Sequence, residues 1–513
     1  EEIRLAQRIN LSICSLVLSL LPQLSQESTP TEAQDGKVAT EQASWHQRIS
    51  TGGEKVLNFV MRAITRATKK KAGDGGSEGV AGAVGILKKM LPYVDQQRGM
   101  EAVQVVEAYY LKANPLGKGK RAAAGLFTEL LSSPDGDYWV STPDAPGHGW
   151  MLSWPTYISQ VLSKDSSAAI FLAKALGRCI RLYAGVYPLP REDLIGKISE
   201  LLRIPSLPEE IKTNMVTSLY YLSPLPPPTL VILCEHARDS SLPEHLRLLP
   251  LEMLFSLLSN QSSPASNISI PLESYMTFAT SALIPSPHPP YPTRGEQRKF
   301  VERGSSYVFG MPHPLPRGTE ALQIIAPALR RVLADEQEMV VTESALSLIL
   351  QGLEGAGKSP SIPMDLSDVL PRAMVTYIST GASSIGDGKS SNPNLEWAYV
   401  RNTFKFEVDL FVRIGRAAGE TVMNTALSNL VEAFGSSNAP HVGPKVLSLI
   451  VRELGSFICV SSMHGSLSKM RTACKTFKGW DSADADRLRL DLDDALRNTK
   501  QSEIEAGEGV AHA

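Results

Sequence analysis

The sequence predicts an all-α fold, an irregular α-solenoid in which stacked helix pairs are joined by long Pro- and Gly-rich loops. Apolar residues recur at helical spacing along most of the chain, as at Met423, Leu427 and Leu430. Strict alternation of apolar and polar residues, which marks half-buried strands, is nearly absent. Prolines stand where the apolar stripes begin, and proline is tolerated at a helix start but disrupts a helix interior.

The clearest predicted helices lie between residues 190 and 283. Pro208-Glu209-Glu210 has the pattern of a helix start, because proline fits the first turn and the acids face the positive end of the helix dipole. Pro243-Glu244 repeats this pattern 35 residues later. Pro190-Arg191 and Pro226-Pro227-Pro228 predict two further starts. Short connectors between these helices indicate pairs.

The proline-started, leucine-striped helix pairs from Glu209 to Leu258 resemble the HEAT/armadillo class of α-solenoids. The resemblance is one of period and pattern, and it extends over most of the chain. It implies a stack of helix pairs with a long surface suited to binding other proteins. An irregular globular helical bundle is the alternative fold, because it uses the same residue pattern.

The composition excludes global disorder and an overall basic binder of nucleic acid. Hydrophobic residues make up 43% and charged residues 20% of the 513 residues, which provides enough apolar material for a core. The 51 Lys and Arg residues are balanced by 53 Asp and Glu, and the net charge of −2 gives no general attraction for phosphates. At about 150 residues per domain, this length predicts about three domains or one repeat array.

Proline-rich stretches suggest how the chain is divided. We expect an N-terminal helical-repeat half over residues 1–283, a Pro-rich linker over 284–316 and a C-terminal helical-repeat half over 317–499. Residues 500–513 are small and polar, and we expect a disordered tail there.

The cysteines and the longest apolar run indicate the compartment. The two closest cysteines, Cys459 and Cys474, are too far apart for a zinc or CxxC motif, and scattered cysteines are typical of reduced intracellular proteins. The apolar run Leu11–Leu21 is shorter than the roughly 20 residues that span a bilayer. We therefore expect a soluble protein of the cytoplasm or nucleus with no membrane span.

One segment matches the phosphate-binding motif GxxxxGK[ST], with Gly352, Gly357, Lys358 and Ser359 at the defining positions. In a true P-loop, a buried strand precedes this motif and a helix follows it. Residues 342–350 instead have helical spacing, and Pro360 and Pro363 follow the motif. The sequence therefore favours a glycine-rich helix end, with nucleotide binding as an alternative.

Two basic clusters could form a patch that contacts nucleic acid or anionic lipid headgroups, or a nuclear-import signal. They comprise Lys69, Lys70 and Lys71, and Lys118, Lys120 and Arg121. Lysines are also common at helix ends, where they improve solubility and face the helix dipole, and this interpretation is preferred. Binding of nucleic acid remains a less favoured alternative.

Two segments are candidates for binding a protein partner. Trp139, Trp150 and Trp154 are half of the six tryptophans and lie in a short stretch that we expect to be rich in loops. Tryptophan is a preferred interface anchor, although it also covers cores beneath loops. Pro289 and Pro290 could present a polyproline turn to a partner.

No set of residues in the sequence combines a nucleophile, a base and an oxyanion donor, and the nine histidines show no metal-ligand spacing. We therefore expect no catalytic residue, no cofactor and no metal. The sequence predicts a non-catalytic scaffold or adaptor subunit of a multiprotein complex, with other protein subunits as its partners.

Overall fold

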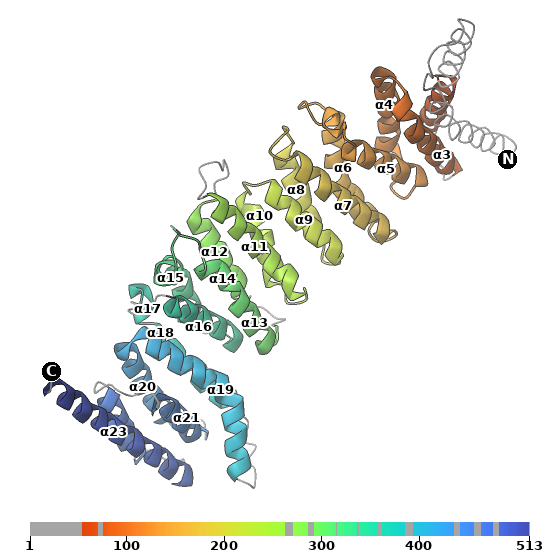
Figure 1. Ribbon diagram of the computed structural model, residues 1–513. Helices are drawn as coiled ribbons and strands as arrows, with labels where there is room; N and C mark the ends of the chain where they lie inside the picture. Colours follow the sequence, from red (N-terminus) through yellow and green to blue (C-terminus); the bar gives the residue numbers. More distant parts are fainter. Residues whose placement is uncertain are drawn as a thin grey trace, which may run out of the picture. The chain divides into compact units, whose positions relative to one another are not determined.

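The computed structural model describes residues 54–69, 75–261, 270–285, 292–313, 315–335, 338–355, 362–384, 393–435, 442–455, 463–475 and 482–511. Apart from one isolated bridge between Ala184 and Tyr187, the regular structure of these residues is helical. The chain forms two compact units, one ending at Leu225 and the other beginning at Pro226. Within each unit, successive helices lie side by side (Figure 1).

The first unit is a stack of helices. Its elements are a helix over residues 54–69, α3 (Gly75–Met90), η1 (Leu91–Tyr93), α4 (Gln96–Lys112), α5 (Lys118–Ser132), η2 (Gly136–Trp139), α6 (Pro146–Val161), α7 (Ser166–Tyr183), α8 (Arg191–Leu202) and α9 (Glu209–Tyr221). Helices α3, α5, α7 and α9 contact one another in succession, and α6 contacts both α7 and α8. Contacts between each helix and the next but one are typical of stacked helix pairs.

The second unit repeats this arrangement. Its helices are α10 (Pro227–Arg238), α11 (Glu244–Gln261), α12 (Leu272–Leu283), α13 (Arg294–Gly304), α14 (Ser306–Phe309), α15 (Thr319–Ala334), α16 (Met339–Glu354), α17 (Met364–Ser367), α18 (Leu370–Ser384), α19 (Pro393–Ala418), α20 (Glu420–Gly435), α21 (Gly443–Gly455), α22 (His464–Ala473) and α23 (Ser482–Ala511). Helices α16, α18, α20 and α22 form one succession of contacts, and α19, α21 and α23 form another. The fold is therefore the all-α solenoid that the sequence predicts.

The predicted helix starts and apolar stripes are confirmed. Helices α8, α9, α10 and α11 each begin at or directly after a proline identified in the sequence. Met423, Leu427 and Leu430 of α20 are all buried, as their helical spacing predicts. The core is the sum of such stripes, each covered by the helices on either side.

The division of the chain differs from the expected one. The segment 284–316 contains α13 and α14 rather than a linker, and the compact units divide at Leu225 and Pro226. Helix α13 is fixed at its start by a capping box between Thr293 and Glu296, and its residues Phe300 and Val301 are buried. Helix α23 extends to Ala511, over most of the segment in which the sequence predicts a tail.

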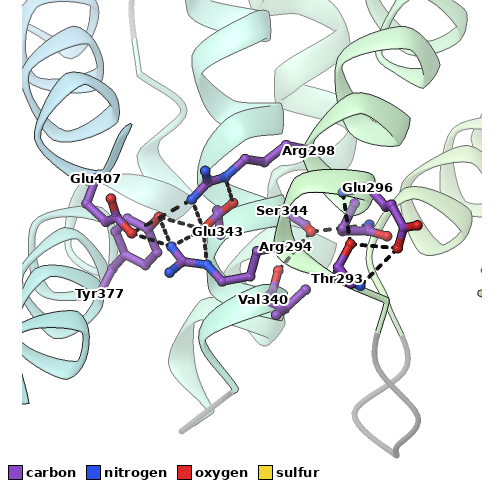
Figure 2. Close-up of polar contacts among 10 residues, drawn as sticks. Thr293, Arg294, Glu296, Arg298, Val340, Glu343, Ser344, Tyr377 and Glu407 are labelled. Atoms are coloured by element: carbon purple, nitrogen blue, oxygen red, sulfur yellow. Dashed lines mark hydrogen bonds and ion pairs between the residues drawn. The ribbon is translucent and has the colours of Figure 1, made fainter. Parts of the chain in front are cut away.

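A buried network of charges ties α13 to three other helices (Figure 2). Arg294 of α13 lies 2.5 Å from Glu343 of α16 and 2.6 Å from Glu407 of α19. Arg298, one turn along α13, also pairs with Glu343. Tyr377 of α18 donates its hydroxyl to the same carboxylate at 2.7 Å. Both glutamate side chains are only 4% exposed, so the two arginines are their main source of countercharge.

The network keeps Glu343 ionised. Burial alone would raise its pKa, but hydrogen bonds from Arg298, Tyr377 and Arg294 outweigh burial and hold the pKa below its ordinary value of 4.5. A carboxylate with a lowered pKa stabilises the fold above the pKa of the unfolded chain. This contribution is lost as the pH falls through the lower pKa of the folded state.

We predict that Glu343→Gln lowers the free energy of unfolding by about 3 kcal/mol at neutral pH, because it leaves Glu407 as the one carboxylate of the network that balances the two partly buried guanidinium groups. The control is Glu354→Gln, which removes an exposed partner of Arg413 and is expected to cost at most about 1 kcal/mol. Urea unfolding followed by circular dichroism measures both. Equal costs for the two variants would contradict this role of the network.

Candidate partner-binding groove

A groove of about 860 Å³ opens in the first unit where several helix ends meet. Its walls come from η1 and the start of α4, from the end of α5 and η2, and from the loop before α8. The polar and aromatic side chains that line it include Asp95, Asp135, Asp137, Tyr138, Trp139 and Tyr187. We call this site the η2 groove.

Three carboxylates give the η2 groove a negative character. Asp95 caps α4, and its side chain accepts a hydrogen bond from the backbone nitrogen of Arg98 at 3.0 Å. Asp135 precedes η2 and is exposed without capping it. Asp137 accepts a hydrogen bond from the hydroxyl of Tyr187 at 3.1 Å. Of the described residues that line the groove, none has a basic side chain.

The phenol of Tyr187 stays a hydrogen-bond donor at neutral pH. Burial and the neighbouring carboxylate of Asp137 both raise its pKa above the ordinary value. The carboxylate of Asp137 therefore accepts its hydrogen bond from a neutral donor.

An aromatic wall joins the groove to the core. The ring of Tyr138, 43% exposed, packs edge-on against Trp139 with 5.3 Å between centroids. Trp139 in turn contacts Trp150 at 5.4 Å, and Trp150 stacks on Phe127 at 4.2 Å with nearly parallel rings. The exposed tyrosine therefore rests on a rigid series of buried rings.

Two hydrogen bonds position this wall. The indole nitrogen of Trp150 donates to Glu107 of α4 at 2.9 Å, and the hydroxyl of Tyr183 donates to the carbonyl oxygen of Leu131 at the end of α5.

The approach of α6 to η2 depends on Gly147. A Cβ atom at Gly147 would overlap the carbonyl oxygen of Trp139 and lie 3.0 Å from the side chains of Leu131 and Val140.

The structure corrects part of the tryptophan prediction. Trp150 and Trp154 lie on helix α6 rather than in a loop, and they are 1% and 0% exposed. Both belong to the core and are not accessible to a partner. Trp139 is 8% exposed and lines the η2 groove. Pro289 and Pro290 lie outside the described residues.

Sequence reasoning identified Trp139 of this groove but not the groove's acids. Asp95, Asp137 and Tyr187 are distant in sequence, and only the packing of α4, α5 and α7 brings them together. The nearest available signal was Asp135-Gly136-Asp137, a short acidic turn directly before the aromatic pair.

The second basic cluster links neighbouring helices. Lys118 pairs with Glu78 of α3 at 2.6 Å, and Arg121 pairs with Asp165 at the start of α7 at 2.6 Å. Lys120 lies over the ring of Tyr110, at 4.8 Å from its centroid, and burial lowers its pKa. In the first cluster, Lys69 is exposed at the end of the helix over residues 54–69, whereas Lys70 and Lys71 lie outside the described residues.

The segment with the phosphate-binding motif begins inside a helix. Residues 342–350 belong to α16, so the element before the motif is a helix, as the spacing predicts, and not a strand. Gly352 is buried in this helix, where a Cβ atom would lie 2.9 Å from the ring of Phe309. Gly357, Lys358 and Ser359 lie outside the described residues.

Within the part of the chain that the structure describes, none of the helices combines the length and the apolar character needed to cross a bilayer. In the same residues, no group of three or more His, Cys, Asp or Glu side chains is placed to hold a metal ion.

Comparisons with known proteins leave the chain without a family assignment. No family model matches it, and no curated protein does. Among solved structures, it is similar to a circular tandem repeat protein with novel repeat topology and enhanced subunit contact surfaces. The two chains are 12% identical, each is covered to 99%, and the TM-score is 0.27. The assignment of the fold therefore rests on the contacts between the helices of this chain.

We predict that Gly147→Ala destabilises the protein by about 1–3 kcal/mol, because the added methyl group meets rigid backbone at Trp139. Gly149→Ala, two residues along the same helix, is the matched control. The nearest atom to its Cβ would be 4.0 Å away, and replacing a helical glycine is expected to stabilise by up to about 1 kcal/mol. Urea unfolding followed by tryptophan fluorescence measures both changes, and effects of the same sign would refute the close approach of α6 to η2.

Proposed function

We propose that the protein is a non-catalytic scaffold or adaptor of the HEAT/armadillo type, which binds other subunits of a multiprotein complex. The observation that carries this proposal is the η2 groove, a concave site with an exposed aromatic ring on a rigid aromatic wall. Exposed tyrosines supported by packed rings are typical anchors of protein interfaces. Stacked helices hold such a site in a fixed position, and a site that only binds a partner requires no catalytic residues.

The local structure supports this function over nucleotide binding. In a P-loop, the backbone amides that cradle phosphate follow a strand, and their position depends on that strand. Here the preceding element is α16, whose residue Glu354 pairs with Arg413 of α19 at 2.8 Å. The end of α16 is thus used for helix packing. The proposal assigns no catalytic residue and no cofactor to the chain.

The charges of the first unit support a protein partner over nucleic acid. Lys118 and Arg121 are each paired with an acid of a neighbouring helix. The η2 groove itself carries carboxylates, which would repel a phosphate backbone. We further propose that the protein works inside the cell, in the cytoplasm or nucleus, where free thiols such as Cys179, Cys234 and Cys474 are stable.

We predict that Tyr138→Ala weakens the capture of at least one partner subunit about tenfold, because it removes the exposed anchor of the groove. The matched control is Phe171→Ala, which removes another exposed aromatic ring of the first unit, on α7. The measurement is affinity purification of the tagged full chain from cells, with quantitative mass spectrometry. If both variants retain the same subunits in equal amounts, the groove is not the partner site.

A second measurement tests the nucleotide alternative. Titration of the full chain with the magnesium complexes of ATP and GTP is expected to give no binding signal in calorimetry, since α16 provides no strand to position the motif. Binding that requires magnesium and is abolished by Lys358→Ala would replace the scaffold proposal with a nucleotide-dependent function.

A further inference from the structure

We infer that the η2 groove receives an extended, basic segment of a partner protein, with lysine or arginine side chains facing its carboxylates. This inference rests on the proposed scaffold function and specifies the chemistry of the partner. Four features of the groove support it: its charge, its aromatic ring, its apolar floor and its concave form.

Among the described residues that line the groove, none carries a positive charge, and the nearby Arg98, whose charge also acts on Asp95, pairs with Glu101. Asp95, Asp135 and Asp137 come from two different parts of the wall. Asp135 and Asp137 are exposed, so a ligand can reach them. A concave site lined by one sign of charge concentrates ligands of the opposite sign. Electrostatic complementarity therefore favours a cationic ligand.

The remaining lining suits the side chains of lysine and arginine. Tyr138 presents an exposed ring, and aromatic rings attract ammonium and guanidinium groups. Leu91, Pro92 and Leu130 add apolar surface to the same groove, and the aliphatic stems of long basic side chains pack on such surface. A small metal ion would use the carboxylates but not the ring or the apolar floor.

A basic segment of a protein fits the groove better than a metal ion or nucleic acid does. A phosphate backbone would meet three carboxylates. The chain has a basic segment of its own, Lys69, Lys70 and Lys71, which is the competing occupant. Their replacement by alanine therefore belongs in the test.

The experiment measures fluorescence anisotropy of a labelled peptide in which arginines and lysines alternate with glycine and serine, titrated with the full chain. We expect binding that weakens with added salt. The double variant Asp135→Asn, Asp137→Asn should weaken binding about tenfold and flatten the salt dependence. The matched control, Asp193→Asn, Glu200→Gln, removes the same charge from exposed positions on α8 and should leave affinity unchanged.

Two results with the variants would overturn the inference: equal peptide affinity of the wild type and the groove variant, or equal losses of affinity in the groove and α8 variants. Two results with other ligands would do the same. These are binding of a peptide with glutamate in place of the basic residues, and tighter binding of a single-stranded oligonucleotide than of the basic peptide. A tenfold gain in peptide affinity on replacing Lys69, Lys70 and Lys71 with alanine would also overturn it, since the groove would then hold the chain's own segment.

The failure of this inference and that of the scaffold proposal are distinguishable. If captured subunits are lost with Tyr138→Ala but retained by the double asparagine variant, the groove is a partner site and the basic chemistry is wrong. If no captured subunit depends on Tyr138, the proposed use of the groove in the scaffold fails as well.

Discussion

The apolar stripe on each helix is the constraint on which the rest of the structure depends. Burying one leucine or isoleucine side chain contributes about 1.5–3 kcal/mol, and a stripe such as Leu172, Leu176 and Ile180 of α7 cannot be buried within a single helix. Each helix therefore packs against its neighbours, and contacts between a helix and the next but one follow directly. The loops at the helix ends are left to form sites such as the η2 groove.

The sequence predicted well those features that are local. Helix starts depend on a proline and the acids that follow it, and α8 to α11 begin where that rule places them. The same rule fails at Pro155, Pro250 and Pro327, which lie inside α6, α11 and α15. An interior proline costs about 3 kcal/mol, which is comparable to the gain from burying one or two further apolar side chains of the helix.

Features that depend on distant residues were predicted poorly. The segment 284–316 has the prolines of a linker, but α13 is held there by Glu343 and Glu407, which lie 49 and 113 residues from Arg294. Of the three tryptophans that the sequence singled out, Trp139 lines the η2 groove, and Trp150 and Trp154 lie in the core. Which tryptophans lie in the core and which line the groove depends on the stacking on Phe127 and on the approach of α6 to η2. Neither contact can be predicted from a local sequence pattern.

The charged cluster around Glu343 and the carboxylates of the η2 groove differ in whether their charges are balanced within the protein. Around Glu343, acids and arginines of the same unit neutralise one another in a buried setting, so the cluster has no need of a ligand. In the η2 groove, carboxylates face an open concave site whose described lining residues include no cation. These carboxylates and the exposed ring of Tyr138 are the features on which the proposed binding of a partner's basic side chains rests.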